Sequence, residues 1–326
     1  MRIAVLVLDD LFDTGLAATL DAFETADALA RADGLGLRYR ATAVAVRRRV
    51  HTHQGLAVPA TAARASRVPD LLLVPALAAR DAEGLEPALG RPDVRDAIAL
   101  IQRWRAAGAR LAAACTGTFL LAEAGVLDGR RATTSWWLAA AFRRRYPRVE
   151  LDLRQMVVAD GPVLTAGAAL AHLDLVLAVI RRGSPALADR VARHLLLDER
   201  ASQAPFAVAA HLDHDDALVR RFEAWARAHL AEPFALGRAA RAVAASERTL
   251  QRRVAASLGT SPLAFVQDLR LERAVHLLRT SGESVDEIAA RVGYGEGGTL
   301  RALLRRRLRV GVRALRPPGA LRGARG

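Results

Sequence analysis

Residues 110–125 read RLAAACTGTFLLAEAG: an apolar run, the only cysteine of the chain, a small-residue turn and a second apolar run. The first run, residues 110–114, has the length and composition of a buried strand, and residues 118–124 predict a helix that ends at Gly125. A strand that turns sharply into a helix lifts one side chain above the sheet edge, as in a nucleophile elbow. Here that side chain is Cys115, and we expect the start of the following helix to favour its thiolate.

The sequence on either side of this turn alternates between strand and helix patterns up to residue 198. Such alternation predicts a three-layer α/β, flavodoxin-like domain with a mostly parallel sheet, in which ligands bind at the carboxyl ends of the strands. The expected strands are residues 2–8, 37–46, 70–74, 110–114, 151–158 and 163–165, and the expected helices are residues 16–31, 94–107, 118–124 and 168–182.

Composition limits the classes of protein that this chain can form. It has 326 residues, 52% of them apolar, and a net charge of +14 that comes from arginine alone, because there is no lysine. A single cysteine excludes a disulfide framework and a multi-cysteine metal site, and it is compatible with a reducing cytoplasm. We expect no metal and no cofactor. The apolar run at residues 3–8 is too short for a signal peptide or a membrane span, and no membrane partner is expected.

The positive charge is concentrated in the last third of the chain. Residues 1–198 carry 26 arginines and 21 acids, whereas residues 214–326 carry 21 arginines and only 11 acids. We therefore predict a first domain at 1–198, an irregular linker at 199–213, a helical DNA-binding domain at 214–316 and a disordered basic tail at 317–326.

The helical domain contains two candidate DNA-reading helices. In the first, Ser246 is the expected N-cap, Leu250 and Val254 share one face, and the opposite face carries polar side chains that can reach bases and phosphates. In the second, Ser284 and Glu287 predict a capping box on the preceding helix, and leucines line one face of residues 298–308. The candidate DNA contacts are Arg248, Thr249, Gln251, Arg252, Thr299, Arg301, Arg305 and Arg306.

The segment from Ala113 to Thr134, with residues 164–167, resembles the ThiJ/PfpI domain of GlxA-type transcriptional regulators. Catalytic members of that superfamily add a histidine and an N-terminal acid to the cysteine. The histidine commonly follows the Thr-Thr pair, where this chain has Ser135, and the acidic position falls near Asp21. A hydroxyl does not titrate near neutral pH, so the resemblance implies a degenerate site of Cys115, Ser135 and Asp21 that could line a ligand pocket.

Residues 220–316 resemble the AraC/XylS DNA-binding domain, which has two helix-turn-helix units joined by a helix. The motifs that carry this likeness are SERTLQRR at 246–253, LRLERA at 269–274 and VDEIAARVGYG at 285–295. The common glycine of the first turn is Ala244, and leucines at 300 and 304 replace the usual phenylalanines. Because smaller side chains bury less area, we expect a less stable second unit with the fold retained.

The two resemblances together predict a sequence-specific transcriptional regulator with a non-catalytic first domain. Its expected partners are double-stranded DNA, a small-molecule effector and a second copy of the chain in a homodimer. One alternative is a cysteine-dependent hydrolase, hydratase or amidase, and another is a structural dimerisation domain whose pocket binds nothing. Accordingly, Cys115 could be a buried unreactive residue, a thiol that lines a ligand or senses oxidation, or a nucleophile.

Overall fold

The computed structural model describes residues 1–153, 155–198, 200, 203, 216–258, 260–308 and 311–316. The chain divides into two compact units, Met1–Ala204 and Pro205–Gly326. The predicted tail at 317–326 and all of the predicted linker except Arg200 and Gln203 lie outside the described residues. No described helix is long and apolar enough to cross a membrane.

The first unit is built on a seven-stranded sheet in the order β3-β2-β1-β4-β5-β9-β8, in which only the β8–β9 pairing is antiparallel. This confirms the predicted three-layer α/β fold. The strands of the large sheet are β1 (Arg2–Val7), β2 (Arg40–Ala45), β3 (Thr61–Ala62), β4 (Leu71–Val74), β5 (Arg110–Ala114), β8 (Val157–Asp160) and β9 (Val163–Ala166). The central strands are apolar because helices cover both of their faces.

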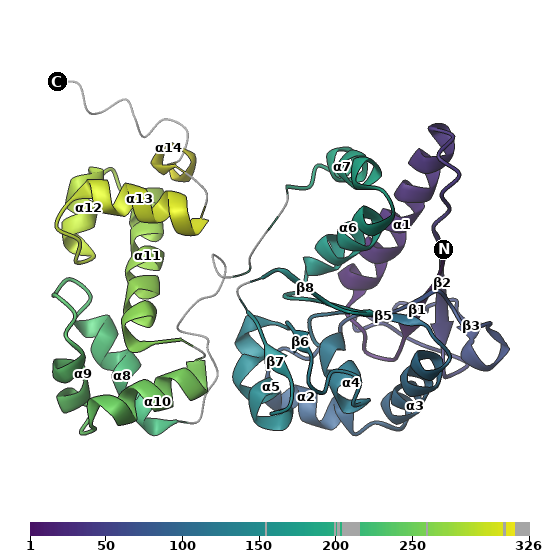
Figure 1. Cartoon of the computed structure of the whole chain (residues 1–326), viewed down its shortest axis with the longest axis horizontal. Helices are drawn as coiled ribbons and strands as arrows, with labels where there is room; N and C mark the ends of the chain where they lie inside the picture. Colours follow the sequence, from purple (N-terminus) through teal and green to yellow (C-terminus); the bar gives the residue numbers. More distant parts are fainter. Residues whose placement is uncertain are drawn as a thin grey trace. The chain divides into compact units, whose positions relative to one another are not determined.

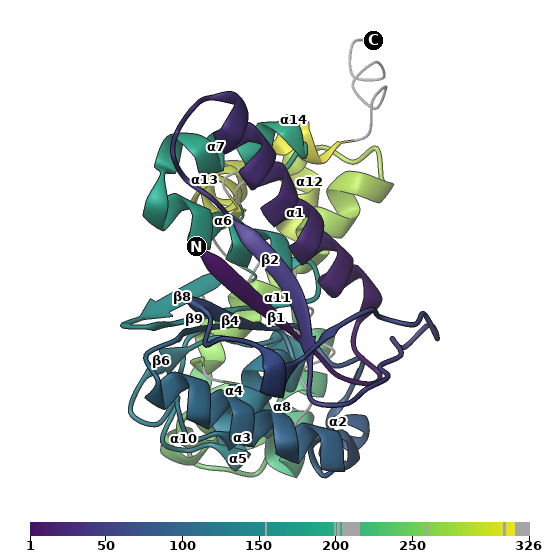
Figure 2. The ribbon, with the colours of Figure 1, turned by 90° about the vertical axis from the view of Figure 1, so that its right-hand side faces the viewer.

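Helices cover both faces of the sheet (Figures 1 and 2). An apolar core on each face holds them there. One face carries α1 (Asp13–Ala32), α6 (Ala171–Gly183) and α7 (Pro185–His194). The other carries α2 (Ala82–Leu89), α3 (Pro92–Ala106), α4 (Gly117–Glu123) and α5 (Ala139–Arg145). Short 3-10 helices, η1 and η2, span Ala63–Ala65 and Trp136–Leu138.

The prediction of a single strand at residues 151–158 is wrong. The structure divides this segment between β7 (Glu150–Leu151), which pairs with β6 (Arg131–Ala132) in a separate two-stranded sheet, and β8 in the large sheet. Arg131 binds the carboxylate of Asp152, Nη2 to Oδ2 at 2.9 Å, where the chain leaves the small sheet. Period-two alternation predicts extended backbone, but it does not say with which partner a strand pairs.

The second unit is helical throughout its described residues, as predicted. Its helices are α8 (Ala217–Ala228), α9 (Leu236–Ala242), α10 (Glu247–Leu258), α11 (Pro262–Thr280), α12 (Val285–Arg291), α13 (Gly297–Leu308) and α14 (Val312–Leu315). Two separate cores form. The first joins α8, α9 and α10 to the first half of α11, and the second joins α12, α13 and α14 to its second half (Figure 1). Helix α11 therefore connects two helix-turn-helix units, α9–α10 and α12–α13.

Candidate functional site

The elbow lies where β5 turns into α4. Cys115 has a φ of 55°, in the left-handed region that few non-glycine residues adopt. Its backbone N–H donates to the carbonyl of Ala166 on β9 at 3.0 Å. A Cβ on Gly117 would lie 2.4 Å from the carbonyl oxygen of Val74, so only glycine lets the turn approach β4 this closely. This is the strand–turn–helix geometry expected from the sequence.

A short polar contact joins the two residues that the degenerate motif singles out. The Sγ atom of Cys115 lies 2.8 Å from the Oγ atom of Ser135, and either can donate the hydrogen bond. Both side chains are buried, with 5% and 0% of their surface exposed. The hydroxyl of Thr134 donates to the carbonyl of Cys115 at 2.7 Å, so the segment before η2 is fixed directly against the elbow.

The expected thiolate is not favoured. Burial raises the pKa of the Cys115 thiol, although hydrogen bonds to Ser135 and Thr116 act in the opposite direction. Desolvation disfavours the charged form of a buried group, and it is the largest of the effects that act on this thiol. At neutral pH Cys115 is therefore a protonated thiol that shares a hydrogen bond with the hydroxyl of Ser135.

The structure does not place Asp21, the third predicted member of this site, in the buried contact of Cys115 and Ser135. Asp21 lies on the exposed side of α1 and has no hydrogen bond or ion pair among the described residues. The buried histidine of the unit, His172, is also already engaged. Its Nε2 accepts from the Ala76 N–H at 3.2 Å, and its Nδ1 donates to the Ala169 carbonyl at 2.5 Å. Burial lowers the pKa of His172 to about 4, so the ring is neutral and has no free nitrogen to act as a base.

Sequence reasoning missed one residue of the elbow region, Gln203. Its side chain is 1% exposed, and its Nε2 donates to the hydroxyl of Thr133 at 3.1 Å and to the carbonyl of Thr134 at 2.9 Å. An isolated polar residue in an irregular segment gives no periodic signal. Gly167 makes room for it, because a Cβ there would lie 2.8 Å from the Gln203 carboxamide.

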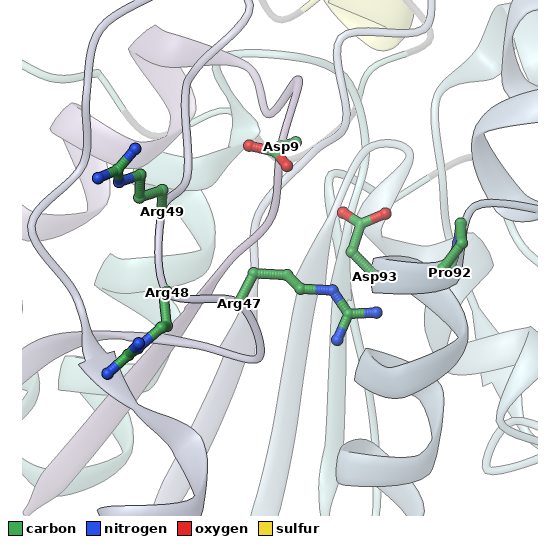
Figure 3. A pocket seen from close by; sticks show the side chains of 6 residues that line it. All are labelled: Asp9, Arg47, Arg48, Arg49, Pro92 and Asp93. Atoms are coloured by element: carbon green, nitrogen blue, oxygen red, sulfur yellow. The ribbon is translucent and has the colours of Figure 1, made fainter.

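A hollow in the first unit, about 600 Å³ in volume, is lined by Asp9, Arg47, Arg48, Arg49, Pro92 and Asp93. Figure 3 shows Arg47 pointing toward the helix that carries Pro92 and Asp93, while Arg48 and Arg49 point the other way. Arg47 pairs with Asp96, and Asp93 pairs with Arg91. Two of the five lining charges are thus in ion pairs, Asp9 accepts the His51 N–H at 2.9 Å, and Arg48 and Arg49 have no ion pair among the described residues. No group of acidic, histidine or cysteine side chains within the described ranges could hold a metal ion.

Helix α10 presents the first set of predicted DNA-contacting residues. Its apolar face, Leu250 and Val254, is fully buried, and Ser246 caps it by accepting the Thr249 N–H at 3.1 Å. Thr249 is half-buried in this cap. The remaining three side chains are exposed and have no hydrogen bond or ion pair within the described part of the unit: Arg248, Gln251 and Arg252.

Helix α13 presents the second set. Leu300 and Leu304 are fully buried, and the predicted capping box of Ser284 and Glu287 holds the start of α12. Asp286 accepts the Gly297 N–H at 3.0 Å, and it also pairs with Arg301 at 3.7 Å. The other candidates on this helix are exposed and unpaired in the ranges that the structure describes: Thr299, Arg305 and Arg306.

The fold and these two regions define a class of protein: an α/β domain with a nucleophile-elbow cysteine, followed by paired helix-turn-helix units. The DJ-1/PfpI family model matches residues 1–182, and a helix-turn-helix domain model matches residues 239–317. The chain therefore belongs to the DJ-1/PfpI family and carries a C-terminal helix-turn-helix domain. Both resemblances drawn from the sequence are confirmed.

Curated relatives and solved structures agree with this assignment. The HTH-type transcriptional regulator CdhR of Pseudomonas aeruginosa is 30% identical over 191 residues, which cover 57% of this chain and 56% of CdhR. The HTH-type transcriptional regulator GbdR of the same species is 29% identical over 208 residues, 63% of this chain and 56% of GbdR. The chain thus spans just over half the length of each. A Vibrio parahaemolyticus crystal structure has the same fold, with a TM-score of 0.51 and 19% identity over 60% of this chain and 98% of that one.

Proposed function

We propose that this protein is a sequence-specific DNA-binding transcriptional regulator. The observation that carries the proposal is the pair of amphipathic helices α10 and α13. Each buries an apolar face and exposes guanidinium groups that have no partner in the described chain. Guanidinium and amide groups on the second helix of a helix-turn-helix unit can read guanine and adenine edges in the major groove. Both curated relatives described above are named as HTH-type transcriptional regulators, which supports the same function here.

We further propose that the first unit binds a small molecule and does not catalyse a reaction. A cysteine hydrolase needs a thiolate and a general base close to it. The raised pKa of the Cys115 thiol, the hydroxyl of Ser135 at the position of the usual histidine, and the engaged ring of His172 all favour a ligand site over an active site.

The proposed regulator acts as a homodimer with its DNA-binding domain at residues 214–316. A dimer fits the two-fold symmetry of most operators, since half-sites lie one or more helical turns apart. The division of the chain between Ala204 and Pro205 supports the placement of a linker at 199–213.

Footprinting and equilibrium binding test the proposal. The full chain is expected to protect a site upstream of the operon that it controls and to bind it far more tightly than random duplex at moderate salt. Arg248→Ala and Gln251→Ala should relax base preference by about 1–3 kcal/mol at the contacted base pair. Arg193→Ala removes an exposed positive charge from α7 of the first unit and should leave preference unchanged. Equal affinity for every duplex would refute the proposal.

A further inference from the structure

The two candidate DNA-reading helices share one framework. Helices α10 and α13 are both 12 residues long, and corresponding positions differ by 50 in residue number. The fully buried pair of α10 is Leu250 and Val254, and the corresponding pair of α13, Leu300 and Leu304, is fully buried too. Because each residue of an α-helix turns the chain by about 100°, corresponding side chains point in the same direction relative to these buried pairs. The exposed faces of the two helices can therefore be compared position by position.

The first two turns of the exposed faces differ. On α10 the positions opposite the buried pair carry Arg248 and Arg252, which are exposed and have no hydrogen bond or ion pair within the described part of the unit. On α13 the same positions carry Gly298 and Ala302, which are exposed as well. The N-terminal residues of the second helix of a helix-turn-helix contact base edges, and a guanidinium there can donate two hydrogen bonds to guanine. At these two positions only α10 has the groups to do so.

The third turn of the exposed faces shows the opposite distribution. Helix α10 carries Ala255 and Ala256 there, whereas α13 carries Arg305 and Arg306. Both of these arginines are exposed and unpaired among the described residues. Side chains toward the C-terminal end of a recognition helix contact the sugar-phosphate backbone more than the base edges. The arginines of α10 are thus placed for bases, and those in the third turn of α13 for phosphates.

The first two turns of α13 offer bases mainly apolar groups. Their one arginine, Arg301, already pairs with the carboxylate of Asp286 on α12 at 3.7 Å. The other outward side chains of this stretch are those of Thr299 and Ala302, both exposed. In the major groove, the methyl groups of threonine and alanine contact the methyl group of thymine. The face that α13 presents to base pairs is therefore complementary to thymine and has no free guanidinium for guanine.

Helix α11 separates the two candidate DNA-reading helices along one axis. It has 19 residues and is about 28 Å long, and α10 and α13 belong to the cores at its opposite halves. One turn of B-DNA is of similar length, about 34 Å, so the two helices can face two stretches of one duplex. We call the base pairs that would face them the α10 segment and the α13 segment of the DNA site.

We infer that guanine is read in the α10 segment alone, and that α13 holds its own segment through phosphates and thymine methyl groups. This inference rests on the proposed function and specifies how each part of the DNA site is recognised. Phosphate contacts position a protein on the duplex without reading its sequence, whereas base-edge contacts carry the specificity. Most of the base preference should therefore come from α10, and α13 should add affinity with a preference for thymine.

Equilibrium binding of the full chain to variants of the footprinted site tests this division. Substitution of a guanine in the α10 segment should lower affinity roughly tenfold or more, and Arg248→Ala should remove that cost at the base pair it contacts. In the α13 segment, about one turn of DNA away, substitution of a guanine should leave affinity nearly unchanged. Replacement of a contacted thymine there by uracil, which removes only the methyl group, should lower affinity about fourfold.

A second experiment supplies α13 with the group that it lacks. A Cβ at Gly298 would meet no atom within 4 Å, so the helix can accept a side chain there. Gly298→Arg places a guanidinium at the position that corresponds to Arg248, and it should create a preference for guanine of roughly tenfold in the α13 segment. Ala256→Arg adds the same charge to the third turn of α10 and should strengthen binding to all duplexes alike.

The outcomes separate this inference from the proposed function. The inference is wrong if guanine substitutions in wild-type binding cost as much in the α13 segment as in the α10 segment, or if uracil replaces every thymine of the α13 segment without loss. It is also wrong if folded Gly298→Arg protein gains no more preference for guanine than Ala256→Arg does. If the wild-type chain binds every duplex equally, the proposed function fails instead.

Discussion

Ala244 and Gly293 occupy equivalent turns of the two helix-turn-helix units, and both have a left-handed backbone. The φ angles are 55° for Ala244, just after α9, and 82° for Gly293, just after α12. An L-residue with a Cβ pays about 1–2 kcal/mol in this region, whereas glycine does not. The turn of the α9–α10 helix-turn-helix therefore carries backbone strain that the turn of the α12–α13 helix-turn-helix avoids.

Replacing Ala244 with glycine should stabilise the second unit of the chain. The relief of left-handed strain exceeds the entropy that glycine adds to the unfolded chain, so we expect a net gain of about 0.5–1 kcal/mol in the free energy of unfolding. Denaturant unfolding of the full chain measures this. Ala255→Gly, at an exposed position within α10, should instead cost up to about 1 kcal/mol. A loss of stability in both variants would contradict the argument.

The reverse change, Gly293→Ala, should be strongly destabilising. Beyond the cost of the left-handed φ, the new Cβ would lie 2.4 Å from the carbonyl oxygen of Leu230 and 2.8 Å from Nη2 of Arg270. Arg270 donates from Nε to that same carbonyl at 2.9 Å, so the clash would also disturb the link between α11 and the loop after α8. We expect a loss of at least about 2 kcal/mol. Unfolding followed by tryptophan fluorescence measures it, and a loss below about 0.5 kcal/mol would argue against close packing at this turn.

The fold was largely predictable because its signals are local. Short apolar runs followed by helix patterns give a parallel sheet with covered faces, and Ser246 and Ser284 mark helix starts by hydrogen bonds to residues only three positions away. The pairing of residues 150–160 was not predictable, because β7 and β8 differ in their partners and not in their own pattern.

The candidate site was predictable only in part. The elbow motif and the Thr-Thr-Ser segment identify Cys115 and Ser135, which meet across 20 residues of sequence. The ionisation of the thiol depends on its burial, which is a property of the packed unit and is not visible in the local sequence. The buried position of Gln203 could not be predicted, because it depends on the space that Gly167 leaves, and these two residues are far apart in sequence.

The buried thiol of Cys115 should make stability fall at high pH. Its pKa is raised in the folded state, so folding favours the protonated form. The contribution is fully present below the ordinary thiol pKa, about 8.5, and is lost as pH rises above it. Cys115→Ala should remove this part of the decline between pH 8 and 10. Unfolding free energies of wild type and variant across that range measure it, and parallel curves would show that the thiol is not desolvated.

His172 should produce the opposite dependence on the acid side. Burial lowers its pKa to about 4 in the folded state, so folding favours the neutral ring. The contribution is present above the unfolded pKa of about 6.5 and is lost as pH falls toward 4, by up to about 3 kcal/mol. His172→Gln should flatten this part of the pH profile at the cost of overall stability, whereas His194→Gln, at an exposed position, should not change its slope. NMR titration of the His172 ring gives an independent check, and a midpoint near 6.5 would contradict the assignment.

Arg305 and Arg306 on α13 should contribute to DNA affinity without contributing to base preference. Both side chains are exposed and unpaired among the described residues, beside a leucine face that is fixed in the second core. A guanidinium that contacts phosphate displaces about one counterion, so Arg305→Ala should weaken binding to specific and random duplexes alike. The slope of log affinity against log salt should also become shallower by about 1. Arg193→Ala again provides the same change in net charge at an exposed site of the first unit. A change in base preference with an unaltered salt slope would assign Arg305 to base reading instead of phosphate contact.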